Sequence, residues 1–79
     1  MKITYDPKYN IAYVSLKDKT EQVNSIKISE EIIIDLAPDG SVYGIELLNA
    51  NEQINADKNG KLQFVNLLSG ISQELKLSK

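Results

Sequence analysis

The stretch IIIDLAPDGSVYGIELL, residues 32–48, decides the fold. Pro38-Asp39-Gly40 predicts a hairpin turn, because proline suits the first central turn position and glycine tolerates the positive φ that follows. Ile32–Leu36 is the most apolar run in the chain and predicts a central strand covered on both faces. Ser41–Leu48 alternates between the two faces of a returning strand. Gly44 inside that strand indicates either a bulge or a close approach of another chain segment.

Other short strands are predicted around this hairpin. Asp6–Asn10 is rich in turn residues, since aspartate and asparagine bond their own backbone and proline presets φ. Period-two alternation and β-branched residues predict strands at Lys2–Tyr5, Ile11–Leu16 and Val23–Ile28. We therefore expect a mostly β protein, a β-rich α+β fold, built on an antiparallel meander of about five strands. One helical turn is expected around Asn51–Ile54.

The segment Lys61–Leu77 fits two structures. As a helix, it places Phe64, Leu67, Leu68, Ile71 and Leu75 on one stripe. As a β-hairpin, it alternates apolar and polar residues after a turn at Ser69-Gly70. Glycine inside a helix costs about 1 kcal/mol relative to alanine, which favours the hairpin. We predict a C-terminal hairpin, with an amphipathic helix packed on the sheet as the alternative.

The composition limits the chemistry available to this chain. The 79 residues are enough for one domain with a thin core, and they include no cysteine, so disulfides and thiolate metal sites are excluded. Histidine is absent too, which removes the commonest general base and metal ligand and rules out a Ser-His nucleophile within the chain. Small cores are often completed by self-association, the remaining route here.

Charge and hydropathy bear on partners and location. The net charge is −2, and all nine basic residues are lysine, whereas arginine makes most bidentate phosphate and guanine contacts. We therefore expect no nucleic-acid binding. The start of the chain lacks a signal-peptide pattern, and no apolar run approaches the roughly 20 residues of a membrane span. The expectation is a cytoplasmic protein without a membrane partner.

The acidic residues near the turns are candidates for a site. Asp6, Asp35, Asp39 and Glu46 could supply a carboxylate pair for hydrolysis, or a hard-cation site together with Asn49. The simpler interpretation gives Asp6 and Asp39 capping roles in their turns, with Asp35 and Glu46 on the surface of the hairpin. Counting from the turn puts Asp35 opposite Val42 or Tyr43, so no compact dyad is predicted. We expect no catalytic, cofactor-binding or metal-binding residues, no cofactor and no enzymatic activity.

Aromatic and aliphatic residues are the candidates for an interface. Tyrosines in a small sheet mostly pack with their hydroxyls at the solvent edge, but they also anchor interfaces. An open sheet has two unpaired edges that must be covered or paired. The candidate interface residues are Tyr13, Tyr43, Phe64, Leu68, Ile71 and Leu75.

These motifs together resemble a known family. The opening Met1-Lys2-Ile3-Thr4-Tyr5-Asp6-Pro7, then a strand containing Tyr13, and later Ile34-Asp35, Asp39-Gly40 and Gly44–Asn51 are similar to the bacterial domain-of-unknown-function family 2283. The resemblance covers Met1 to about Gln53. Asn10 and Asn49 stand where the family commonly has aspartate, so a role that needs those charges is not expected here. The resemblance implies a small β-rich domain without an established activity, and some members are encoded near toxin-like or phage-related proteins.

A single domain over residues 1–79 is expected, with a family-like core at 1–53 and a C-terminal extension at 54–79. The predicted function is a small protein-interaction module that forms a homodimer. Two alternatives remain at this point. One is an antitoxin-like or phage-derived inhibitor that masks a protein partner from a neighbouring gene. The other is a small ligand-binding or hydrolytic enzyme that uses carboxylates near the turns.

Overall fold

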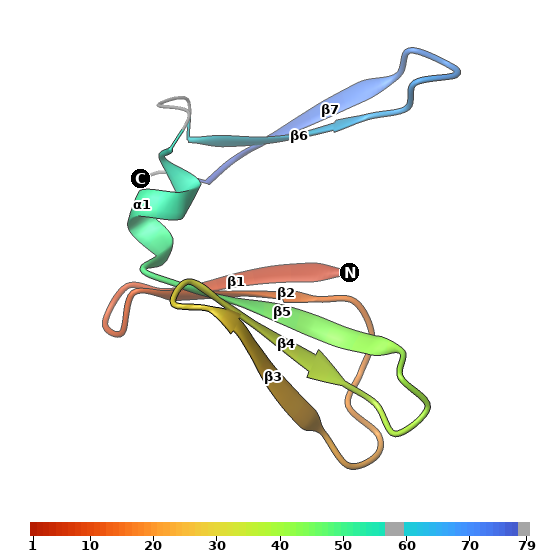
Figure 1. The fold of residues 1–79 in the computed structure, drawn as a ribbon. Coiled ribbons are helices and arrows are strands. Elements are labelled where there is room, and N and C mark those ends of the chain that lie inside the picture. Colours follow the sequence, from red (N-terminus) through yellow and green to blue (C-terminus); the bar gives the residue numbers. More distant parts are fainter. Residues whose placement is uncertain (57–59, 78–79) are drawn as a thin grey trace.

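The structure is a computed structural model that describes residues 1–56 and 60–77. Seven strands and one short helix follow one another along the chain (Figure 1). The elements are β1 (Lys2–Asp6), β2 (Ile11–Ser15), β3 (Asn24–Ser29), β4 (Ile32–Leu36), β5 (Val42–Leu48), α1 (Ala50–Ile54), β6 (Lys61–Val65) and β7 (Ser72–Lys76). The predicted fold class is confirmed, and the predicted strand bounds agree within one or two residues.

The first five strands form one antiparallel sheet in the order β1-β2-β5-β4-β3. This order departs from a simple meander at one place, where β5 lies between β2 and β4. Residues 16–23 carry the chain from β2 to the far edge of the sheet, and the backbone N–H groups of Leu16 and Lys17 donate to the carbonyl of Tyr43 on the way. The hairpin around Gly40 therefore returns β5 to the middle of the sheet.

The two faces of the sheet differ sharply in polarity. One cross-strand row on the first face contains, from edge to edge, Ile3, Val14, Ile45, Ile34 and Ile26. The adjacent row on the opposite face contains Lys2, Ser15, Gly44, Asp35 and Ser25. The period-two alternation of each strand places these residues, because successive side chains point to opposite faces.

Helix α1 is joined to the sheet through asparagine side chains. Asn49 enters the helix with φ 53°, and Asn10 in the β1–β2 turn has φ 56°, both in the left-handed region that asparagine tolerates. The Asn10 amide nitrogen donates to Oδ1 of Asn49 (3.2 Å) and of Asn51 (2.6 Å). The backbone N–H of Asn51 donates in return to Oδ1 of Asn10 at 2.8 Å. The β1–β2 turn therefore positions the helix.

Strands β6 and β7 form a separate two-stranded hairpin, in the segment where the sequence left a helix as the alternative. Its turn spans residues 66–71 and is longer than a Ser69-Gly70 turn. Asn66 Oδ1 accepts from the backbone N–H groups of Leu68 and Ser69, and Gly70 has φ 76°. The hairpin stands away from the five-stranded sheet, with α1 between them (Figure 1).

The core is very small. Among the described residues, the buried hydrophobic side chains are Ala12, Ala37, Tyr43 and Ala50. The expectation that Ile32–Leu36 is covered on both faces is wrong, because Ile32, Ile33 and Ile34 are only half-buried. The strand is interior within the sheet, but a single layer leaves its apolar face without a full second layer.

Candidate functional site

A buried carboxylate lies at the centre of the polar face. Asp35 is 6% exposed, and its Oδ1 accepts a hydrogen bond from Ser25 Oγ on β3 at 2.7 Å. Its Oδ2 accepts from Tyr13 Oη on β2 at 2.9 Å and lies 3.0 Å from Lys19 Nζ. Lys19 also stacks over the Tyr13 ring, 4.7 Å from its centroid. Asp35 therefore ties β4 to two other strands and to the β2–β3 connection.

The protonation states of this Asp35 cluster are held by its own contacts. Burial raises the pKa of Asp35, but hydrogen bonds from Ser25, Lys19 and Tyr13 outweigh it and leave the pKa below its ordinary value. The hydrogen bond to Asp35 raises the pKa of Lys19. Burial, then the hydrogen bond to Asp35, raises the pKa of Tyr13. All three shifts move the pKa values away from neutrality, so the cluster holds charges in place and offers no proton donor or acceptor poised near pH 7.

Gly44 is explained by the Tyr13 side chain. A Cβ at Gly44 would lie 2.5 Å from Tyr13 Oη and 2.6 Å from the carbonyl oxygen of Val14. Both predicted features are observed at this glycine, the close approach of another segment and a bulge. Asp35 pairs with Gly44 and Leu36 pairs with Val42, so Tyr43, directly before Gly44 on β5, is the extra residue of the bulge. This register shift places Asp35 opposite Gly44 instead of Val42 or Tyr43.

The other acids occupy the positions that turn chemistry predicts. Asp6 Oδ1 accepts from the backbone N–H of Lys8 at 2.9 Å, and Asp39 Oδ1 accepts from that of Ser41 at 2.9 Å. Glu46 pairs with Tyr13 and Ile33, so Asp35 and Glu46 are not cross-strand partners. Within residues 1–56 and 60–77, no group of three acids is placed to hold a metal ion. The prediction that Asp35 lies on the surface is wrong, since its carboxylate is buried.

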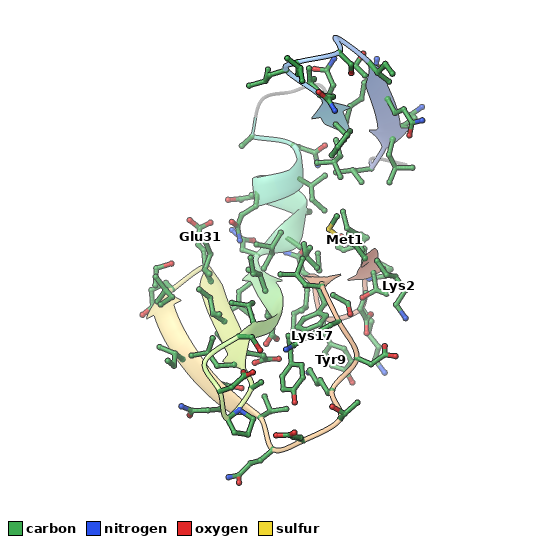
Figure 2. All side chains as sticks on the ribbon, turned by 90° about the vertical axis from the view of Figure 1, so that its right-hand side faces the viewer. Met1, Lys2, Tyr9, Lys17 and Glu31 are labelled. Carbon is green, nitrogen blue, oxygen red and sulfur yellow. The ribbon has the colours of Figure 1, made fainter. Side chains whose placement is uncertain are left out.

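The predicted interface residues lie in three different settings. Tyr13 is half-buried in the Asp35 cluster. Tyr43 is 2% exposed, and its hydroxyl accepts from the backbone N–H of Glu21 at 3.0 Å, so its side chain is not on the surface of this chain. The remaining four lie on the C-terminal hairpin and are exposed: Phe64 66%, Leu68 98%, Ile71 64% and Leu75 54%. Figure 2 shows the hairpin side chains as a group separate from those of the sheet.

An apolar groove lies where the hairpin meets the rest of the molecule. It has a volume of about 400 Å³, and its walls come from the apolar face of the sheet, from α1 and from the base of the hairpin. Among its lining residues are Ile3, Val14, Leu47, Ile54, Leu62 and Leu77. Phe64 and Leu75 share the face of the hairpin on which Leu62 lies, so the apolar face of the hairpin continues the groove wall.

Sequence reasoning missed this groove, and it missed the exposed tip residue Leu67, which is 94% exposed. The alternation in β6 and β7 predicted the apolar face of the hairpin. The groove is lined by α1 as well as by that face, and α1 is positioned by contacts with Asn10, 39 to 41 residues away in sequence.

Comparison with known proteins identifies the family of this chain. A family model described as "Protein of unknown function (DUF2283)" matches residues 2–51. The chain belongs to the DUF2283 family. The matched residues contain all five strands of the sheet and end at the start of α1, so the β6–β7 hairpin lies beyond the match. Neither the curated proteins nor the solved structures contain a match.

Within the described part of the chain, no helix is long and apolar enough to cross a membrane. The exposed apolar residues of the hairpin and the groove at its base are features of the described chain for which a binding role can be argued from geometry.

Proposed function

We propose that this chain is a protein-interaction module whose first partner is a second copy of itself. The observation that carries the proposal is the imbalance between its core and its surface. The buried hydrophobic residues of the described chain are three alanines and one tyrosine, whereas thirteen large hydrophobic residues are exposed. A domain of this size normally depends on more burial than that for its stability.

The hairpin concentrates this exposed surface. All residues of β6 and β7 are exposed, and an isolated two-stranded hairpin is marginally stable in water. Its apolar face carries Leu62, Phe64 and Leu75, and this face borders the groove. Burying a leucine or phenylalanine side chain contributes about 1.5–3 kcal/mol, so a second copy that covers this face would stabilise hairpin and sheet together.

The Asp35 cluster supports a scaffolding role over an enzymatic one. At neutral pH Asp35 and Lys19 keep their charges and Tyr13 stays neutral, and within the described residues no buried side-chain oxygen or nitrogen lacks a hydrogen-bond partner. A cluster of this kind holds the sheet in register. It leaves the opposite, apolar face as the surface for binding.

A matched pair of substitutions tests the proposal. Phe64 and Tyr9 are both aromatic and almost equally exposed, at 66% and 65%, but Tyr9 lies in the β1–β2 turn, away from the hairpin. Light scattering over a range of protein concentrations should give a dimer for the natural chain and for Tyr9→Ser. Phe64→Ser should weaken the dimer by at least about tenfold, the equivalent of one buried aromatic side chain. A monomer at every concentration would refute the proposal.

A further inference from the structure

The groove and the hairpin tip of this chain lie at opposite ends of the hairpin, so they do not meet within one copy. The base of the hairpin lines the groove through Leu62 and Leu77, and the tip lies at the opposite end of the same hairpin. The tip presents two consecutive leucines, Leu67 and Leu68, that are 94% and 98% exposed. With Ile71 at the same tip they form a contiguous exposed apolar patch, and patches of this kind mark interaction sites when they are large enough.

We infer that the Leu67–Leu68 tip of a second copy occupies the groove. This contact rests on the self-association proposed above and would be the interface between the two copies. If two hairpins pack antiparallel about a two-fold axis, each tip reaches the base of the other hairpin. Each copy then gives and receives the same contact, so the assembly closes as a dimer.

Volume and charge agree with this arrangement. A cavity of about 150 Å³ holds a benzene-sized group, so the groove of about 400 Å³ has room for two leucine side chains. The tip from Val65 to Gln73 carries no charged residue. The tip therefore brings no charge that would have to be desolvated when it enters the groove, and Lys61 at the groove wall meets no like charge.

The buried area is also sufficient. Seven exposed apolar side chains lie on each hairpin: Leu62, Phe64, Val65, Leu67, Leu68, Ile71 and Leu75. At roughly 60–120 Å² per side chain, reduced for their partial burial, two copies bring on the order of 800 Å² of apolar surface together. The hairpin backbones and groove walls add to this area. The total buried surface then reaches the lower end of the range for stable interfaces, about 1,200 Å².

Disulfide cross-linking tests the contact directly, because the natural chain has no cysteine. Leu68→Cys places a thiol on the tip, and Ala56→Cys places one at the groove. When the two variants are mixed and oxidised, the mixed disulfide should form in preference to either symmetric one. The control mixture pairs Leu68→Cys with Glu30→Cys in the β3–β4 turn, where no mixed disulfide should accumulate.

Substitution of the tip separates this inference from the proposed function. The double variant Leu67→Ser/Leu68→Ser should keep its fold, since both side chains are exposed, and should weaken the dimer about a hundredfold. Ile28→Ser on edge strand β3, where Ile28 is 59% exposed, should leave the dimer unchanged.

Three outcomes would overturn the inference. A natural chain that stays monomeric refutes both it and the proposed function. A dimer that the tip variant does not weaken, without the mixed disulfide, refutes the groove contact alone. Sedimentation of the monomeric natural chain with phosphatidylcholine vesicles, lost in the tip variant, would assign the tip to a lipid surface instead.

Discussion

Asp35 shows how one residue can be polar inside the most apolar stretch of the chain. Within Ile32–Leu36, Ile32 and Ile34 lie on the apolar face of the sheet, whereas Ile33 and Asp35 lie on the opposite face. The run therefore alternates like its neighbours, and Asp35 finds Ser25, Tyr13 and Lys19 on its own face.

Replacing Asp35 by asparagine should destabilise the fold by about 1–3 kcal/mol at neutral pH, because the ion pair with Lys19 and one charged acceptor are lost. The lowered pKa means that the carboxylate stabilises the fold above its ordinary pKa, near 3.8, and that this contribution disappears as the pH falls through the lowered value. The difference between the natural chain and Asp35→Asn should therefore shrink in acid. Urea unfolding across the pH range measures it, with exposed Asp18→Asn as the control.

The raised pKa of Lys19 gives the opposite dependence at high pH. Its contribution is complete below 10.5 and is lost as the pH rises through the raised value. Stability that stayed constant from neutral pH through both extremes would contradict the role given to the Asp35 cluster.

Gly44→Ala should be destabilising although the strand conformation suits alanine. The new Cβ would lie 2.5 Å from Tyr13 Oη and 2.6 Å from a backbone oxygen, and overpacking of this kind costs about 1–3 kcal/mol. Gly70→Asn is the matched control, because Gly70 has open space around it and a φ of 76° that asparagine tolerates. Thermal unfolding that ranked the two variants the other way would contradict the account of Gly44.

At the scale of elements, side-chain hydrogen bonds link α1 to the β1–β2 turn and to the sheet. Asn10 donates to Asn49 and Asn51, and Gln53 Nε2 donates to the carbonyls of Glu31 (2.9 Å) and Leu48 (2.5 Å). These bonds join a five-residue helix, too short to be stable alone, to three parts of the sheet.

Asn10→Asp should loosen this link. A carboxylate cannot donate to Oδ1 of Asn49 or Asn51, so two hydrogen bonds are lost and the expected cost is about 1–2 kcal/mol. Aspartate tolerates the left-handed backbone of Asn10, so the loss of stability measures the missing hydrogen-bond donor and not backbone strain. Chemical denaturation compared with Asn24→Asp, an exposed position on β3, measures the cost, and equal stability of the two variants would contradict it.

The strands could be predicted from the sequence because alternation and turn residues are local. Ser41–Leu48 and the Asp39 turn were found in this way. The order of the strands could not be predicted, because residues 16–23 carry no pattern that says which edge the chain returns to. The partners of Asp35 were missed for a related reason, since Lys19 lies in that connection and Ser25 follows it.

The candidate interface stays a prediction, and the structure gives only the exposure of its residues. Four of these residues lie exposed on the hairpin, namely Phe64, Leu68, Ile71 and Leu75. Tyr43 is buried, and its hydroxyl accepts a hydrogen bond from the backbone of Glu21 that no local pattern predicts. The groove is formed by the sheet, α1 and the hairpin together, so its position could not be predicted from local sequence patterns.

At the scale of the whole molecule, the chain has two apolar surfaces and little core. The described residues extend over 35 × 34 × 19 Å with a radius of gyration of 14.0 Å, and residues of both the sheet and the hairpin line the groove. The hairpin stands away from the sheet (Figure 1). A second copy that covers the hairpin would supply the missing layer, and the stability of the fold would then depend on association.

The most direct test is the unfolding temperature of the natural chain as a function of its concentration. Our account predicts that this temperature rises steadily from micromolar to millimolar protein, because a dimer is favoured over unfolded chains by mass action. The rise should be smaller for Phe64→Ser than for Tyr9→Ser. An unfolding temperature independent of concentration, with a single cooperative transition, would show that one copy is stable without a partner and would contradict the account.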